Sequence, residues 1–130
     1  MNVFLSFVKE DRTYAMRLAN ALRIQGVKIL DVVEDPSADD AFSLVQNALT
    51  RTDLFVFIVP EHEGQSNWAL MELGAAKALN KRIIGIVPSF ARFANSDVAR
   101  RLSSEGLIDA EGLTAGELAV HVLASQPLAA

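Results

Sequence analysis

The residues with the clearest chemical potential lie in the segment SNWALMELGAAKAL, residues 66–79. On a helix, Trp68 and Glu72 share one face with small apolar residues, because side chains four positions apart lie one above the other. A carboxylate among apolar neighbours costs several kcal/mol, roughly, unless a partner or a pocket compensates for it. Glu72 is therefore either half of a structural ion pair, with Arg12 or Lys9 as its partner, or the charged group of a ligand site.

Other groups that could carry chemistry are scarce. The chain has no cysteine and only two histidines, His62 and His121, so neither thiolate chemistry nor a metal site is expected. Ser6 ends the first apolar run, where a serine more often satisfies backbone groups than acts as a nucleophile. No histidine is placed by the sequence to activate it. Glycine-rich phosphate-binding motifs are also missing.

The composition is that of one globular domain. The chain has 130 residues, of which 51% are hydrophobic and 22% charged, and we expect a domain over residues 1–125 with a frayed tail at 126–130. No window approaches the run of about 18 apolar residues that spans a bilayer, and no basic leader precedes the first apolar run. We therefore expect a soluble, cytoplasmic protein. The net charge of −4 argues against nucleic-acid binding, which depends on lysine and arginine.

Apolar runs alternate with helical patterns along the whole chain. Residues 54–59 and 82–87 are almost continuously apolar, which is typical of strands buried on both faces. Shorter strand patterns occur at 3–7, 27–30 and 106–108, and Thr114 is placed to cap a last helix. Five such β-then-α units predict a flavodoxin-like α/β domain of three layers, with a parallel sheet in the order 2-1-3-4-5 and helices on both faces.

This topology predicts where a site should lie. Ligands of open parallel sheets bind beyond the carboxyl ends of the strands. If Ser66 caps the helix that follows the third strand, Glu72 lies in its second turn and leans toward that edge, with Trp68 one turn closer to it. The remaining segments expected at this edge are Phe7–Asp11, Asp31–Asp40, Pro60–Ser66 and Pro88–Phe93.

Three stretches together resemble a Toll/interleukin-1 receptor (TIR) domain of the bacterial kind: VFLSFVKEDRTYAMRLANALRIQGVKILD, TDLFVFIVP and SNWALMELGAAKALNKRIIGIVP. The resemblance covers residues 2–90 or so. Its most specific part is Ser66, Trp68 and Glu72 followed by Leu73, which match the family's S-x-W-x-x-x-E-L pattern. Two departures are visible: DVVEDPSADD lacks the glycine common in that loop, and the C-terminal third is generic.

The resemblance implies a function. Some TIR domains are scaffolds that only associate, whereas others cleave NAD+ at the nicotinamide–ribose bond with a glutamate at the position of Glu72. It implies that NAD+ is a substrate and not a cofactor, and that the products are nicotinamide and ADP-ribose or a cyclic ADP-ribose, in bacterial immune signalling against phage. It also implies a homo-oligomer on activation, or a partner TIR or effector protein. The substrate would be bordered by Phe7, Val8, Lys9, Asp31, Trp68 and Ser66.

Two alternatives stay open at this point. In the first, the protein is a TIR scaffold that acts by self-association, to which its unevenly distributed charges would contribute. In the second, it is another N-glycosidic enzyme, because ELGAAKALNKRIIGIV also resembles the glutamate-bearing helix and following strand of nucleoside deoxyribosyltransferases and their hydrolase relatives.

Overall fold

The computed structural model of the protein describes residues 1–30, 41–62, 67–94 and 96–125. Its centre is a five-stranded sheet in the order β2-β1-β3-β4-β5, in which every neighbouring pair is parallel. The predicted strand order and flavodoxin-like architecture are therefore confirmed. The expected tail at 126–130 lies outside the described residues. The strands are β1 (Asn2–Ser6), β2 (Lys28–Ile29), β3 (Leu54–Ile58), β4 (Arg82–Val87) and β5 (Leu107–Asp109).

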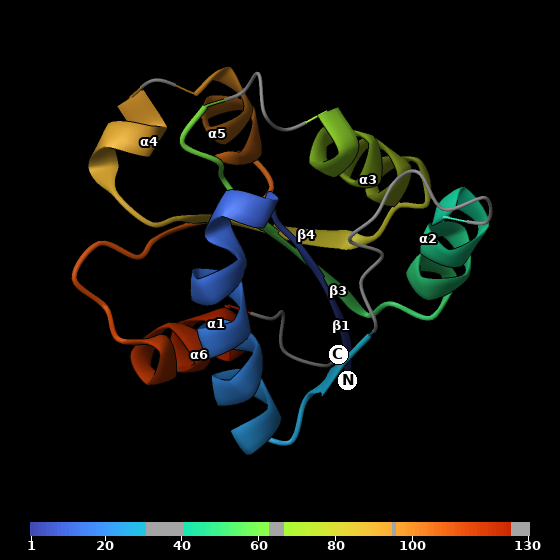
Figure 1. The fold of residues 1–130 in the computed structure, drawn as a ribbon, viewed down its shortest axis with the longest axis horizontal. Coiled ribbons are helices and arrows are strands. Elements are labelled where there is room, and N and C mark those ends of the chain that lie inside the picture. Colours follow the sequence, from blue (N-terminus) through green and yellow to red (C-terminus); the bar gives the residue numbers. More distant parts are fainter. Residues whose placement is uncertain (31–40, 63–66, 95, 126–130) are drawn as a thin grey trace.

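Helices cover both faces of this sheet, as Figure 1 shows. One face carries α1 (Arg12–Ile24), which follows the short 3₁₀ helix η1 (Lys9–Asp11), and α6 (Ala115–Ala124). The other face carries α2 (Ala41–Thr50), α3 (Asn67–Ala78) and α5 (Asp97–Leu102). The short helix α4 (Phe90–Ala94) follows β4 directly.

The last helix begins as its sequence predicts. The Thr114 side chain accepts a hydrogen bond from the Glu117 backbone N–H, and the Glu117 side chain accepts one from the Thr114 backbone N–H, both at 3.1 Å. This reciprocal pair satisfies donors that the first turn of a helix leaves without partners. Between residues 88 and 106, in contrast, the sequence indicated only a loose segment, and the structure has α4 and α5 there.

The two faces of the sheet form two separate cores. In β1, Val3 and Leu5 pack toward α1 and α6, whereas Phe4 packs toward α2 and α3 and stacks on Phe55 of β3. Successive side chains of a strand point to opposite faces, so one strand supplies both cores. All five residues of β3 are buried, which agrees with its continuously apolar sequence.

The topology also defines the edge of the sheet at which a site is expected. The chain runs from β1 outward to β2 and then crosses to β3 on the other side of β1, so the direction of winding reverses between β1 and β3. Ser6, the last residue of β1, pairs with Phe57 of β3 at this reversal. No helix in the described parts of the chain is long and apolar enough to cross a membrane.

Candidate active site

Glu72 lies on the face of α3 that packs against the sheet. The buried residues of this helix are Ala69, Glu72, Leu73 and Ala76, and their spacing of three, one and three positions is that of a single helical face. The carboxylate is thus part of the stripe that faces the core, and the residue is only 1% exposed. The sequence-based placement of Glu72 among apolar neighbours agrees with this geometry.

One hydrogen bond holds the carboxylate. The Ser6 hydroxyl donates to Oε1 of Glu72 over 2.9 Å, and both residues are buried. Among the described residues, Oε2 of Glu72 accepts no hydrogen bond. A buried carboxylate has about four acceptor positions, so a single neutral donor leaves most of its capacity unused. The two oxygens of Glu72 therefore have different surroundings.

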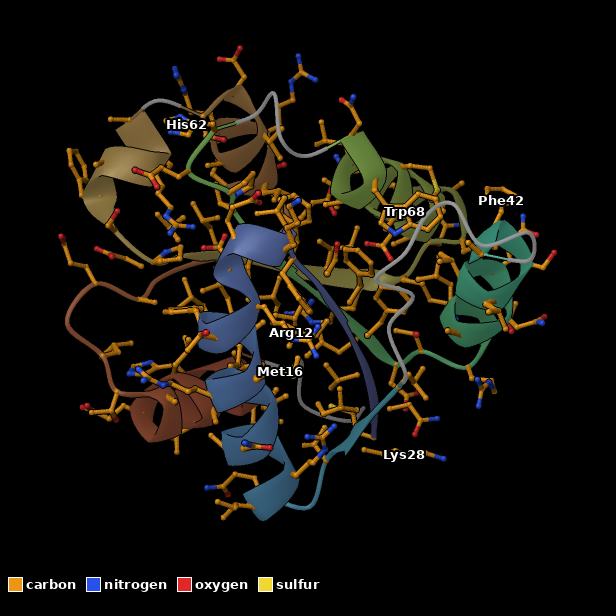
Figure 2. The ribbon with its side chains drawn as sticks, viewed as in Figure 1. Arg12, Met16, Lys28, Phe42, His62 and Trp68 are labelled. Atoms are coloured by element: carbon orange, nitrogen blue, oxygen red, sulfur yellow. The ribbon has the colours of Figure 1, made fainter. Side chains whose placement is uncertain are left out.

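The structural ion pair considered for Glu72 is not found. Within the described ranges, no salt bridge includes it. Arg12 belongs to α1, which covers the opposite face of the sheet (Figure 2). Burial raises the pKa of Glu72 from its ordinary 4.5 to about 8, and the Ser6 hydrogen bond lowers it only in part. At neutral pH the carboxyl group is therefore mostly protonated, and a positive charge placed beside it would favour its ionisation.

Trp68 and Val8 lie on the same side of the sheet as Glu72. Trp68, labelled in Figure 2, is half-buried on α3 one turn before Glu72 and packs against the apolar core beneath α2 and α3. Val8 is 6% exposed and belongs to the same core. Two of the predicted substrate-binding residues are thus placed on the face that carries the carboxylate.

Of the other predicted substrate-binding residues, two lie in the described part of the chain and two do not. Phe7 is half-buried and packs against the core beneath α1 and α6, on the face opposite to Glu72. Lys9 is exposed and begins η1, and Phe7 and Val8 separate it from the end of β1. Asp31 and Ser66 lie outside the described residues, so their roles stay predictions.

Sequence reasoning missed the partner of Glu72. It assigned Ser6 to the satisfaction of backbone groups, whereas the structure directs its hydroxyl to a side chain 66 positions away. The alternation of β1 contained the relevant signal, because Ser6 falls on the same face as Phe4 and is therefore directed toward α3. Which residue of α3 it would meet depends on how the helix packs, and no local pattern gives that.

A second buried carboxylate lies near the same edge of the sheet. Nη1 of Arg92, on α4, lies 2.8 Å from Oδ2 of Asp11 and also donates to the Val59 carbonyl over 3.1 Å. Asp11 is 6% exposed. This ion pair connects η1, the end of β3 and α4, and sequence reasoning did not foresee it.

A hollow of about 250 Å³ also opens near this edge, beside α4. Glu72 is not one of its lining residues, and the predicted pocket at Glu72 stays a prediction. In the described ranges no three His, Cys, Asp or Glu side chains are grouped so that they could hold a metal ion. The hollow is lined by Val87, Phe90, Phe93, Leu107 and Asp109.

These observations define a class of protein: a flavodoxin-like α/β domain with a buried carboxylate near the reversal of its strand order. The family model described as "TIR domain" matches residues 3–117, and the chain belongs to the TIR domain family. The resemblance seen in residues 2–90 thus extends into the C-terminal third, which the sequence pattern alone did not assign.

Two similar proteins have informative names. The "3' cyclic ADP-D-ribose synthase AaTIR" of Aquimarina amphilecti is 31% identical over 128 residues, covering 93% of this chain and 38% of that protein. The chain thus spans less than half the length of this relative. The solved structure of the CMP N-glycosidase BcmB of Clostridium botulinum has a TM-score of 0.67 and 18% identity, covering 97% of this chain and 100% of that one. At this identity the similarity shows the fold alone.

Proposed function

We propose that the protein cleaves the bond between nicotinamide and ribose in NAD+, with Glu72 as the catalytic residue. The single observation that supports this most is the state of the Glu72 carboxylate, which is buried without a cation and has one oxygen that accepts no hydrogen bond from the described residues. A carboxylate in such a setting interacts strongly with positive charge, because a low-dielectric surrounding screens it poorly. NAD+ carries that charge at the nicotinamide ring.

The proposed reaction needs only one carboxylate. The bond between C1′ of the ribose and the ring nitrogen breaks, and its electron pair goes to that nitrogen, so nicotinamide leaves as a neutral molecule. The positive charge develops on C1′ and the ring oxygen of the ribose, and an ionised Glu72 stabilises it more in the transition state than in the ground state. Glycosidases use a second carboxyl group to protonate the leaving oxygen. Nicotinamide requires no such proton.

The second half of the reaction decides the product. If water attacks C1′ and loses a proton, the product is ADP-ribose, and if a nucleophile of the same ADP-ribose attacks, the product is cyclic. The name of the Aquimarina relative favours a cyclic product. We further propose that this product acts as a messenger in bacterial immune signalling against phage, and that the protein works as a homo-oligomer or with a partner TIR or effector protein.

The substrate would contact residues near the carboxyl ends of β1 and β3. Trp68 offers a flat surface one turn before Glu72, and Val8 and Lys9 border the end of β1. Because Glu72 is 1% exposed, a neighbouring group must move aside before the substrate can reach Oε2. Phe7, Asp31 and Ser66 complete the proposed substrate-binding set.

The test is an incubation of the purified chain with NAD+ at high protein concentration, with nicotinamide and the ADP-ribose products separated by liquid chromatography. Wild-type protein should release nicotinamide, and Glu72→Gln should lower the rate by about a hundredfold or more, because it removes the charge and keeps the shape. Glu105→Gln is the matched control, since it makes the same change on an exposed side chain. Equal rates in wild type and Glu72→Gln would refute the assignment, and no release by wild type would favour the scaffold.

A second candidate is an N-glycosidase that acts on nucleotides or nucleosides. One observation favours it: with a pKa of about 8, Glu72 is mostly protonated at pH 7 and could donate a proton to a departing neutral base. The name of the Clostridium botulinum structure makes CMP a suitable substrate to compare. The same assay with CMP and deoxyribonucleosides beside NAD+ distinguishes the two candidates, since base release without nicotinamide release would replace the first by the second.

A further inference from the structure

The hydrogen bond between Ser6 and Glu72 has no part in the proposed reaction as described above. Ser6 is fully buried at the end of β1, and its hydroxyl donates to Oε1 of a carboxylate on a different element. The hydroxyl could have bonded a backbone carbonyl, as the hydroxyls of Thr52 and Ser103 do. Instead it forms the single hydrogen bond that Glu72 makes with described side chains.

We infer that Ser6 is a positioning residue for Glu72, whose hydroxyl holds Oε1 so that Oε2 is the oxygen presented to the ribose. This inference rests on the proposed function of Glu72. A glutamate side chain has three rotatable bonds, and α3 fixes only where it starts. The bond to β1 fixes where it ends. The oxygen that remains without a hydrogen bond is then the one able to interact with a substrate.

No charged side chain competes for this role in the described ranges. Neither β1, β3 nor α2, which pack on or beside α3, contains a charged residue. In β4 the single charged residue is Arg82, at the opposite end of the strand, and it donates to the Ser125 carbonyl over 2.6 Å. On α3 itself, Lys77 is exposed and pairs with Glu105. The orientation of Glu72 therefore depends on the neutral hydroxyl of Ser6.

The hydroxyl should also affect ionisation. A hydrogen bond to a carboxylate stabilises the charged form, and the Ser6 bond opposes the larger effect of burial on the pKa of Glu72. Without the hydroxyl, the carboxylate would be both less well oriented and harder to ionise. A residue with a purely structural role would change neither property. This difference makes the inference testable.

The experiment compares Ser6→Ala with Ser6→Thr, which restores a hydroxyl. Ser6→Ala should lower kcat by about 10- to 100-fold, the worth of a hydrogen bond to a charged group, while KM changes little. The low-pH limb of its rate profile should move to higher pH, and Ser6→Thr should move it back. Ser96→Ala is the matched control, because it removes another buried serine hydroxyl, the cap of α5, and should lower the melting temperature without moving the limb.

A direct titration separates this inference from the proposed function. The Glu72 carboxyl carbon is labelled with ¹³C, assigned by its absence in Glu72→Gln, and titrated by NMR in wild type, Ser6→Ala and Ser96→Ala. A midpoint that rises in Ser6→Ala alone supports the role of Ser6, and an unchanged midpoint overturns it, whatever the activity. Wild-type protein that releases no nicotinamide overturns the proposed function instead.

Discussion

Two carboxylates are buried near the carboxyl ends of the central strands, and they differ in the charge of their hydrogen-bond partners. Asp11 lies 2.8 Å from the guanidinium of Arg92, which also donates to the Val59 carbonyl. Glu72 is more deeply buried and receives one bond from the neutral hydroxyl of Ser6. The first carboxylate has the cationic partner that a buried charge requires, and the second has none among the described residues.

If Glu72 acts as proposed, this difference separates a structural site from a functional one. The pair of Asp11 and Arg92 connects three segments that are far apart in sequence, namely η1, the end of β3 and α4. Glu72 joins α3 to β1 through the neutral hydroxyl of Ser6, and it opposes the folded state when it is ionised. Sequences tend to keep such a locally unfavourable group where function requires it. In the proposed reaction, the cation missing from the Glu72 site is supplied by the substrate.

The largest expected effect concerns stability. Burial raises the pKa of Glu72 in the folded state from the unfolded value of 4.5 to about 8. The folded protein therefore loses stability as the pH rises through this range, because folding then opposes ionisation of the carboxyl group. Glu72→Gln removes this dependence. The free energy of unfolding of the variant, measured relative to that of wild type, should therefore increase as the pH rises, by at most roughly 4 to 5 kcal/mol between about pH 5 and pH 9. Urea unfolding at several pH values measures the difference.

Asp11→Asn is the comparison variant for this measurement, since Asp11 has a cation beside it. It should be less stable than wild type near neutral pH, where Glu72→Gln is more stable. A stability difference between Glu72→Gln and wild type that does not change with pH would mean that Glu72 ionises in the folded protein as easily as in the unfolded chain.

The pH dependence of activity should follow from the same burial. If the ionised form of Glu72 is the reactive one, kcat/KM for NAD+ should rise about tenfold per pH unit up to about pH 8, or roughly a hundredfold from pH 6. The limb of kcat should lie at lower pH, because the positive ring of bound NAD+ favours the carboxylate. Initial rates over this range, at low and at saturating NAD+, give both limbs. Coincident limbs would contradict a direct contact between the ring and Glu72.

Much of the fold could be predicted because its signals are local. The almost continuously apolar runs at 54–59 and 82–87 could be buried on both faces only between two layers of helices. The alternation of strands and helices then restricted the sheet to few topologies. The cap at Thr114 was equally local. The helices α4 and α5 have five and six residues, too few to show a periodic pattern, and they were missed.

The site was predictable in part. Glu72 was identified because a charge interrupts the apolar face of a helix, and this pattern depends only on the spacing within α3. Its bond to Ser6 and the ion pair of Asp11 with Arg92 join residues 66 and 81 positions apart. Such pairs depend on how α3 and α4 pack on the sheet, which a single sequence does not encode in any local pattern. Phe7 was grouped with Trp68 because both are aromatic, although Phe7 packs against the core beneath α1 and α6 and Trp68 against the core beneath α2 and α3.

A smaller effect is expected when the structural carboxylate loses its cation. Arg92→Met leaves Asp11 buried and also removes the donor to the Val59 carbonyl, so we expect a loss of about 2 kcal/mol, below the range for fully buried pairs because Arg92 is 18% exposed. Adding Asp11→Asn should recover part of the loss. Denaturant unfolding of the two single variants and the double variant gives the coupling energy, and a coupling near zero would remove the contrast with Glu72.

The smallest effect is expected at the exposed pair between Lys77, on the same helix as Glu72, and Glu105, which follows α5. Lys77 lies 3.2 Å from Glu105, but their side chains are 41% and 33% exposed, so water competes for both charges. A double-mutant cycle with Lys77→Met and Glu105→Gln should therefore give a coupling under about 0.5 kcal/mol, and added salt should reduce it further. A coupling as large as that of Asp11 with Arg92 would show that distance and not burial decides the strength of these pairs. The unusual state of Glu72 could then no longer be attributed to its removal from water.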